Sequence, residues 1–468
     1  MSQPEKKRVL ILITIQFSVR YILRTGLLQS MARFADPVIW ITWRDEKLIK
    51  ELESVGATVY PMPVAKYGKY YNFFRDVIKE KFKRIVKSAS TKIDEKRGTL
   101  IYGKPVFSFF NRIILYGRKL LSYLLAKFIL LRIHDWLMKI DTSLKEVEAL
   151  LRSQKIDVLF SVTPFLREEQ VIIGACKHRK LQTITSILSF DNITTRGFMP
   201  TVFDHYCVWN KYNFDELYRV YPEVNNSTVE IVGPIQFDFY WDKSFLWSKD
   251  KWLSELGLPS GRSFILFGGA SYSIVPHEQA WLAQIDLAIA NGEITGNPVV
   301  LFRKHPIDPI ARWLPVLADS KNIVRDDPWR SDDGTSKMNI TRSDIEKLCS
   351  TLFWCDVHVN ASSTMTVDGA IFDKPQIGPA YDDSTDRKYD EITKDLYIRE
   401  HYKPITDSGG LAVVNSRQEL IQAINISLKN PEIGREGRKK LVKEICFYAD
   451  GKSTERLASH LERYICAS

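Results

Sequence analysis

The sequence predicts an α/β protein built from two doubly wound, parallel-stranded domains that face a shared cleft. Short apolar runs such as Val9–Ile15 alternate with stretches of helical period, which is the pattern of buried parallel strands and crossover helices. The alternation stops after residue 61, resumes at Asp157, and starts a second series after Leu258. A chain of 468 residues is also too long for one ordinary core.

The first domain is expected at residues 1–238. Val9–Ile15 is too short to cross a membrane and has no small-residue cleavage site behind it, so it predicts a buried strand and not a signal peptide. Glu230–Asp238 predicts a strand that runs into the domain linker. The other expected strands are Val38–Thr42, Ala57–Tyr60, Asp157–Val162, Thr183–Leu188 and His205–Trp209, and the expected helices are Tyr21–Phe34, Asp45–Val55, Arg167–Arg179 and Tyr212–Val220.

The second domain is expected at residues 239–445. A C-terminal helical segment, residues 446–468, is expected to pack back on the first domain, with Ser453 and Thr454 as cap candidates. The second domain's expected strands are Phe264–Phe267, Val299–Phe302, Asn322–Val324, a strand from Asp356 and one after Pro375, and its expected helices are Glu278–Ala290, Ser343–Phe353, Met365–Ile371, Arg417–Leu428 and Arg435–Tyr448.

A basic insertion at about residues 62–140 interrupts the first domain. It holds 18 lysines and arginines against 5 acidic residues, whereas the whole chain has a net charge of +10. Asn111–Ile140 carries an apolar stripe of helical period, but charges interrupt it too often for a transmembrane helix. Two interpretations stay open: a helical layer packed on the sheet with its charges solvated, or peripheral contact with an anionic membrane. No nucleic-acid-binding signature is present, so no nucleic acid partner is expected.

Cysteine usage predicts a reduced, cytoplasmic protein. The six cysteines form no CxxC pair and have no nearby histidine at zinc spacing, so no metal site and no cofactor are expected. If the basic insertion binds lipid, the expected location is the inner face of the cell membrane.

A hydroxyl-rich turn in the second domain predicts an anion site. Ser362, Ser363 and Thr364 lie between a strand and a helix, at the strand end where open α/β sheets bind ligands. A helix N-terminus favours a phosphate, and Asp368 is expected to face the same crevice about one turn further in. The alternative is that these hydroxyls only cap the helix.

Two further loops point to the same ligand. The first contains Gly269 and Ser271 and follows a strand, so its backbone could approach a phosphate closely, although turns also use glycine for conformation alone. The second places Arg303, Lys304 and His305 at a strand's carboxyl end, where arginine would clamp a diphosphate and histidine would donate or protonate. The alternative for this second loop is a solvated basic turn.

No convincingly placed DxD motif is present, which agrees with a metal-independent site. The acidic pairs Asp326-Asp327 and Asp332-Asp333 are expected to cap turns.

These motifs resemble those of a known enzyme family. His305-Pro306, followed by Ala361–Pro375, resembles the nucleotide-binding half of GT-B glycosyltransferases, and in particular a bacterial surface-polysaccharide group related to CDP-glycerol glycerophosphotransferases and UDP-N-acetylglucosamine 2-epimerases. Phe190–Gly197, Val208–Asn210 and Val232–Asp238 resemble the middle region of the same group. The resemblance covers roughly residues 150–380 and implies two Rossmann-like domains. It has three departures: many GT-B transferases carry glutamate in place of Asp368, the loop after the first strand lacks the Gly-rich turn often seen there, and the basic insertion is not part of the common core.

The acceptor side is expected in the first domain. Asp191 is the candidate catalytic base, since an inverting transferase needs a group to take the acceptor hydroxyl's proton, and its alternative is a turn residue. Asn192 and Arg196 are expected to position substrate. Glu278 is either a ligand contact or a first-turn partner of the helix dipole, and His277 beside it is expected to be structural.

The sequence therefore predicts a metal-independent enzyme, a GT-B glycosyltransferase. It would move a sugar from a nucleotide-diphosphate donor to a surface-polysaccharide or glycolipid acceptor, with His305 acting in catalysis. Three alternatives stay open: a polyol-phosphate transferase with a CDP-activated donor, a nucleotide-sugar 2-epimerase, and a non-enzymatic glycan- or membrane-binding module.

Overall fold

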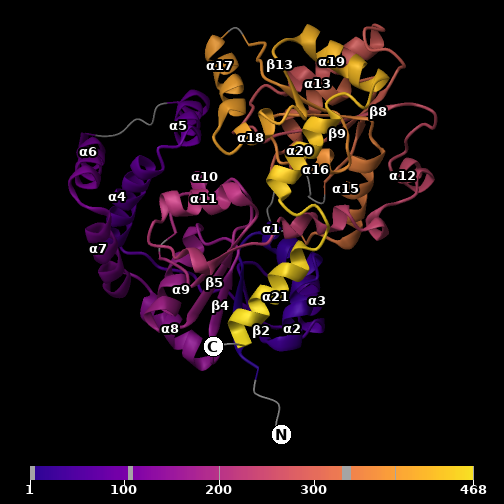
Figure 1. The fold of residues 1–468 in the computed structure, drawn as a ribbon. Helices are drawn as coiled ribbons and strands as arrows, with labels where there is room; N and C mark the ends of the chain where they lie inside the picture. The colour runs from indigo at the N-terminus through magenta and orange to yellow at the C-terminus, as the bar shows by residue number, and fades with distance from the viewer. Residues whose placement is uncertain (1–5, 104–108, 200, 329–338, 385, 467–468) are drawn as a thin grey trace. The chain divides into compact units, whose positions relative to one another are not determined.

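Both halves of the chain contain a fully parallel sheet, as predicted. The computed structural model describes residues 6–103, 109–199, 201–328, 339–384 and 386–466 (Figure 1). These residues form two compact units. Unit 1 comprises residues 1–91, 105–236 and 452–468, and unit 2 comprises residues 92–104 and 237–451.

Unit 1 contains a seven-stranded sheet in the order β3-β2-β1-β4-β5-β6-β7, with every neighbouring pair parallel. The order runs outward in both directions from β1 and β4, which makes that pair the topological switch point of a doubly wound sheet. Its elements are β1 (Arg8–Ile13), α1 (Gln16–Val19), the π-helical turn η1 (Arg20–Arg24), α2 (Leu27–Phe34), β2 (Asp36–Ile41), α3 (Glu46–Ser54), β3 (Thr58–Pro61), α4 (Lys69–Val86), α5 (Ala89–Tyr102, which passes into unit 2), α6 (Phe109–Leu124), α7 (Lys127–Ile140), α8 (Leu144–Ser153), β4 (Val158–Ser161), α9 (Arg167–His178), β5 (Gln182–Ser186), α10 (Asn192–Thr195), β6 (His205–Val208), α11 (Lys211–Val220), η2 (Asn226–Thr228), β7 (Val229–Ile231) and α21 (Ser453–Cys466).

Unit 2 contains a six-stranded parallel sheet in the order β10-β9-β8-β11-β12-β13. Its switch point lies between β8 and β11. Its elements are η3 (Ile235–Tyr240, which begins in unit 1), η4 (Lys243–Phe245), α12 (Lys249–Glu255), β8 (Phe264–Gly268), α13 (Gln279–Ala290), β9 (Val299–Arg303), η5 (Ile310–Arg312), α14 (Leu314–Ala318), β10 (Ile323–Arg325), α15 (Arg342–Trp354), β11 (Val357–Asn360), α16 (Met365–Ile371), β12 (Gln376–Pro379), α17 (Arg387–Asp395), η6 (Leu396–Ile398), α18 (Lys403–Thr406), β13 (Leu411–Val414), α19 (Arg417–Lys429) and α20 (Arg435–Cys446).

The core of unit 1 lies on both faces of its sheet because successive residues of a strand point to opposite faces. Val9 and Ile11 of β1 belong to a buried cluster that includes Leu457 and Leu461 of α21, so the C-terminal helix packs on this face. Leu10 and its neighbours belong to a second cluster, which the insertion helices α4 and α7 cover together with α8 and α9.

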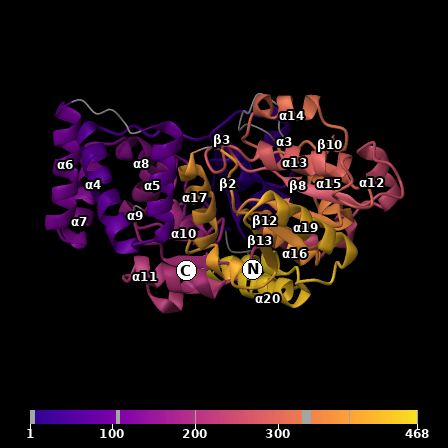
Figure 2. The same cartoon turned by 90° about the horizontal axis from the view of Figure 1, so that it is seen from above.

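The insertion forms a helical layer in which α4 lies beside both α6 and α7 (Figures 1 and 2). Tyr71, Phe82 and Leu137 turn inward and are buried. This confirms that part of the insertion packs on the sheet.

Two helix predictions need correction. The helix expected over Tyr21–Phe34 is broken, because Gly26 has a left-handed φ of 81° and starts α2 as a separate helix. The stripe expected over Asn111–Ile140 is divided between α6 and α7, since Ala126 is extended, with ψ of 151°. Strand β13 and several helices, among them α8, α12, α14, α17 and α18, have no counterpart in the predicted elements.

Candidate functional site

The candidate site lies at the carboxyl edge of the unit 2 sheet. At this edge β8 leads into the loop of Gly269 and Ser271, and β11 leads into the hydroxyl turn of Ser362–Thr364. The two strands are neighbours, with Gly268 paired to Asn360, so the two loops start side by side at the switch point. Ligands of open α/β sheets bind at this place.

The two glycines after β8 allow close packing of the loop. A Cβ on Gly268 would lie 2.8 Å from Met365 Sδ, at the start of α16. A Cβ on Gly269 would lie 3.2 Å from the Trp313 ring and 3.4 Å from Lys304 Cα. Glycine at both positions therefore lets the loop pack closely against Met365, Trp313 and the backbone of Lys304.

The backbone of this loop is largely occupied by bonds within the protein. The N–H of Gly269 donates to the carbonyl of Arg303 at 2.9 Å. The N–H of Ala270 donates to Glu278 Oε2 at 2.8 Å, and that of Tyr272 to Asp308 Oδ1 at 3.1 Å. The Ser271 and Ser273 hydroxyls lie within hydrogen-bond distance of each other at 3.0 Å, and Ser271 is 6% exposed, so contact of Ser271 with an anion stays a prediction.

Glu278 braces the loop from inside the protein. It is fully buried, and while one carboxylate oxygen accepts the Ala270 N–H, the other is ion-paired with Arg312. Arg312 also pairs with Asp308 at 3.0 Å. Burial raises the pKa of Glu278 to about 8, and the Arg312 guanidinium opposes that shift. Both carboxylate oxygens face protein groups, which favours the structural alternative, and contact of Glu278 with substrate stays a prediction.

Two of the three basic residues in the loop after β9 are buried. Arg303 is only 4% exposed, and its Nη1 pairs with Asp326 Oδ2 at 2.7 Å. Lys304 is equally buried and donates to the Asp308 carbonyl at 3.1 Å. Nη2 of Arg303 is buried without a hydrogen-bond partner among the described residues, so direct contact of Arg303 with a donor stays a prediction.

His305 is the half-buried member of this loop. Its Nδ1 lies 3.2 Å from the Ile307 N–H, which donates to it. In the neutral ring the proton then sits on Nε2, so the imidazole is set to donate a hydrogen bond through that atom.

Hydrogen bonds within unit 2 hold the hydroxyl turn in place, and its last residue, Thr364, is exposed. Ser362 has a left-handed φ of 41°, and its hydroxyl donates to the Leu396 carbonyl at 3.0 Å. Ser363 Oγ accepts the Met365 N–H at 3.2 Å. Thr364 is the N-terminal flanking residue of α16, makes no side-chain cap bond and is exposed, whereas Asp368 is buried at 6% exposure.

Neighbouring side chains hold this turn in place. The Thr366 hydroxyl lies 2.8 Å from Asn360 Oδ1 and 2.8 Å from the Tyr402 hydroxyl. All three residues are buried. The start of α16 is therefore hydrogen-bonded both to Asn360 at the end of β11 and to Tyr402, the residue before α18.

Of the two sequence-predicted acidic pairs, the described one, Asp326-Asp327, forms ion pairs with neighbouring basic residues. Asp326 is buried beside Arg303 and, through its second oxygen, 3.3 Å from Lys347 Nζ. Asp332 and Asp333 lie outside the described residues. Across the described ranges, no group of three or more His, Cys, Asp or Glu side chains is arranged to hold a metal ion.

The acceptor-side candidates follow β5 in unit 1. Asp191 precedes the short helix α10, and its carboxylate accepts the Thr195 hydroxyl at 3.2 Å. Asn192 is buried at 7% exposure, and Arg196 is exposed. Their roles toward an acceptor stay predictions.

A histidine–aspartate pair at the unit 2 edge was missed by the sequence reasoning. His277 Nδ1 lies 3.0 and 3.2 Å from the two carboxylate oxygens of Asp382, which follows β12. The Asp382 side chain is 1% exposed, whereas that of His277 is 39% exposed. The pair spans 105 positions of the chain, so no local sequence pattern could have indicated it.

A second missed cluster lies at the switch point of unit 1. Glu169 of α9 is fully buried and accepts hydrogen bonds from three hydroxyls: Thr14 at 2.5 Å, Ser161 at 2.6 Å, and Thr163. Burial raises the pKa of Glu169 from 4.5 to about 7, although the hydroxyls oppose the shift. The carboxyl group is thus ready to hold a proton near neutral pH.

We expect Glu169→Gln to stabilise the protein increasingly as pH rises. Below pH 4 the carboxyl is protonated in both the folded and the unfolded chain. Between pH 5 and 8 the unfolded chain ionises while the folded carboxyl resists, so the wild type loses roughly 2 kcal/mol that the neutral amide does not lose. Urea unfolding of both proteins at pH 5 and pH 8 measures this difference. If the difference in unfolding free energy between the variant and the wild type were the same at pH 5 and pH 8, Glu169 would be ionised in the folded protein.

Comparison with known proteins places the chain in a family. The family described as CDP-glycerol:poly(glycerophosphate) glycerophosphotransferase matches residues 200–463, more than half of the chain and nearly all of unit 2. The chain belongs to this family. The match confirms the resemblance to the bacterial surface-polysaccharide group, and the chain is accordingly an enzyme with transferase activity of the glycosyltransferase type.

Solved structures confirm the fold. A putative UDP-N-acetylglucosamine 2-epimerase from Listeria monocytogenes matches with a TM-score of 0.56 and 11% identity over 99% of this chain and 98% of that one. A UDP complex of S. aureus MnaA matches with a TM-score of 0.55 and 11% identity over 99% and 98%. A glycosyltransferase from Rickettsia africae matches with a TM-score of 0.51 and 10% identity over 99% of both chains. Identities this low establish the two-domain GT-B architecture alone, and no curated protein sequence matches the chain significantly.

Proposed function

We propose that this enzyme transfers a sugar from a nucleotide-diphosphate donor to a hydroxyl of a surface-polysaccharide or glycolipid acceptor. The observation that carries the proposal is the meeting, at one switch point, of the hydroxyl turn Ser362–Thr364 and the loop of Ser271, in a domain that the transferase family covers. The loop of His305 follows β9, the strand on the other side of β8. Hydroxyls and an imidazole N–H suit the oxygens of a diphosphate.

In the proposed reaction an acceptor hydroxyl oxygen attacks the anomeric carbon of the sugar. The new carbon–oxygen bond forms as the bond from that carbon to the diphosphate breaks, and the nucleoside diphosphate leaves with the bonding electron pair. The hydroxyl proton passes to a base, for which Asp191 is the first-domain candidate. His305 Nε2–H would stabilise the charge that develops on the leaving diphosphate.

The pair formed by His277 and Asp382 supplies a second acid–base candidate. Because Nδ1 is held by a buried carboxylate, the orientation of Nε2 is fixed, and the His277 side chain is 39% exposed. A carboxylate that orients an imidazole in this way is the arrangement found in catalytic triads.

A second candidate function is transfer of a polyol phosphate from a CDP-activated donor, which the family's description favours. Here the acceptor oxygen attacks the β-phosphorus, the bond between that phosphorus and the bridging oxygen breaks, and CMP leaves. The same anion-binding groups would serve, so the two functions differ in the leaving group: a nucleoside diphosphate in one case and CMP in the other.

Binding of activated donors tests the proposal. Thermal-shift measurements with UDP-, GDP-, CDP- and CMP-sugars and with CDP-glycerol should show stabilisation by at least one nucleoside-diphosphate compound, because a ligand that binds only the folded state raises the melting temperature. Absence of stabilisation by every compound would overturn both candidate functions.

The insertion supports a peripheral membrane contact for a lipid-linked acceptor. Large apolar side chains on α6 and α7 are exposed at helical spacing, among them Tyr116 at 72%, Leu120 at 58%, Tyr123 at 71%, Phe128 at 64% and Trp136 at 57%. Exposed arginines and lysines lie among them, including Arg112, Lys119 and Arg132. Apolar rings among cations fit the interface of an anionic bilayer. In the described part of the chain, no helix is long and apolar enough to span a membrane.

We expect Leu120→Glu and Phe128→Glu each to weaken binding to anionic liposomes about tenfold, since each removes one apolar side chain from the interface and adds a repelled charge. Co-sedimentation with phosphatidylglycerol vesicles measures the effect. Ile398→Glu, an equivalent change at a 62% exposed position of unit 2, is the matched control and should leave binding unchanged. Equal sedimentation of the wild type with anionic and neutral vesicles would contradict the membrane contact.

A further inference from the structure

A groove in unit 2 lies apart from the candidate donor site. It has a volume of about 470 Å³ and runs between the C-terminal end of α16 and one face of α20. The hydroxyl turn is at the opposite end of α16, so the two sites do not share residues. The volume falls within the range of small-molecule sites in proteins.

The groove is lined by apolar side chains, which we call its floor, and by cationic side chains, which we call its rim. Ile371 of α16 and Val442 of α20 contribute to the floor. Arg435, Lys439 and Lys443 lie along the rim at intervals of four residues, which places them on one face of α20.

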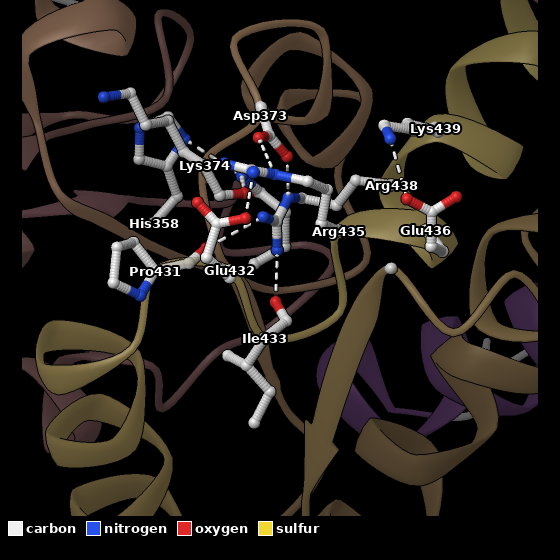
Figure 3. A network of polar contacts seen from close by, with 12 residues as sticks. His358, Asp373, Lys374, Pro431, Glu432, Ile433, Arg435, Glu436, Arg438 and Lys439 are labelled. Atoms are coloured by element: carbon white, nitrogen blue, oxygen red, sulfur yellow. Dashed lines mark hydrogen bonds and ion pairs between the residues drawn. The ribbon is translucent and has the colours of Figure 1, made fainter.

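A network of ion pairs fixes the groove's wall (Figure 3). Asp373 lies two residues beyond the end of α16 and has a left-handed φ of 55°. It accepts from Arg435 Nε at 2.6 Å and from Arg438 Nε at 2.8 Å. Arg438 is 1% exposed and also donates to the Pro431 carbonyl at 2.9 Å. The network ties α20 to α16 and to the segment before α20, so the groove is preformed.

The charge at the rim is only partly balanced. Arg435 is engaged with Asp373, and Lys439 pairs with Glu436 at 2.7 Å (Figure 3). Lys443 has no acidic partner among the described residues and is exposed. An anion at the Lys443 end of the groove would therefore meet an uncompensated ammonium.

Phe447 closes the apolar side of the groove from a strained turn. It has φ of 61° and ψ of −58°, and the Tyr448 N–H donates to the Cys446 carbonyl at 2.6 Å, which is the geometry of a γ-turn that side-chain-bearing residues rarely adopt. The ring is 41% exposed. Strained backbone conformations cluster at active sites and ligand clamps, which makes this turn a candidate part of a binding site.

We propose that this groove binds a single-chain lipid phosphate, with the phosphate at Lys443 and the hydrocarbon chain along Ile371, Val442 and Phe447. The combination of the two surfaces decides the ligand class. A neutral lipid would leave the Lys443 ammonium without a counter-charge. A phosphate without a hydrocarbon chain would leave the apolar floor exposed to water. This inference does not depend on the identity of the donor or on the transfer reaction.

Calorimetric titration of the full chain with dodecyl phosphate, below its micelle concentration, tests the proposal. We expect saturable binding at one site, at least tenfold tighter than that of inorganic phosphate or of dodecyl maltoside, which has the same chain without charge. Lys443→Glu should weaken binding at least tenfold. Lys440→Glu makes the same charge change on the same helix at a residue that does not line the groove, and it should stay within twofold of the wild type.

Val442→Trp gives an independent second variant, because it fills the floor without changing charge. It should also weaken binding of dodecyl phosphate while leaving the melting temperature near that of the wild type. Binding of dodecyl maltoside as tight as that of dodecyl phosphate, or equal binding by the Lys443→Glu and Lys440→Glu variants, would overturn the proposal. So would inorganic phosphate binding as tightly as the alkyl phosphate.

Discussion

Replacement of His305 by glutamine is expected to lower the turnover rate about 10²–10⁴-fold. His305 is the member of the basic loop that is not buried, and its Nδ1 is occupied by the Ile307 N–H. Glutamine also carries an N–H donor, but the Ile307 N–H would no longer fix its orientation, so the donor would not be held where Nε2–H meets the charge that develops on the diphosphate. The loss should therefore fall on kcat, while stabilisation by the nucleotide changes only a few-fold.

Initial rates with a saturating donor measure this effect. His178→Gln is the matched control, because His178 lies in the last turn of α9 in unit 1 and pairs with Glu148. It should retain wild-type activity. Retention of more than half of the wild-type kcat by the His305→Gln variant would remove His305 from the mechanism.

The second large effect concerns stability. Asp326→Asn is expected to destabilise the protein by about 3–5 kcal/mol, since it leaves the buried Arg303 guanidinium without its counter-charge. Asp326 Oδ1 also lies 3.3 Å from Lys347 Nζ, so the variant removes the counter-charge of a second cation. The midpoint of urea unfolding should fall accordingly.

Asp327→Asn is the control for this change. Asp327 is the next residue in the chain, pairs with Arg325 and has a 44% exposed side chain. Its replacement should change the free energy of unfolding by no more than about 0.5 kcal/mol. If Asp326→Asn were equally mild, Arg303 would not depend on Asp326, and its prediction as a donor clamp would gain weight.

The fold could be predicted from the sequence because its strands are buried on both faces. Val9–Ile15 and Val299–Phe302 stand out as continuous apolar runs, and the structure places β1 and β9 within two residues of them. Strand β13 was missed because only Leu411 and Val414 of its four residues are buried, which leaves a weak signal at the sheet's edge. The helix over Tyr21–Phe34 was predicted as continuous because a single glycine is no reliable sign of a helix break.

The site could be predicted as a set of loops but not as a set of contacts. Loop positions follow from strand ends, so the turn of Ser362–Thr364 and the loop of His305 were found. The partner of Arg303 could not be found, because Asp326 reaches it only through the pairing of β9 with β10. The same holds for His277 and Asp382, which the packing of unit 2 brings together.

Analysis of the nucleotide released from the donor tests the central claim most directly. The purified enzyme, incubated with each activated donor and without an acceptor, should slowly hydrolyse one nucleotide sugar and release the nucleoside diphosphate with one equivalent of free sugar. The His305→Gln variant should release it at least a hundredfold more slowly. Release of CMP from CDP-glycerol would instead select the polyol-phosphate reaction. Conversion of an intact nucleotide sugar to its 2-epimer, with no nucleotide released from any donor, would contradict group transfer.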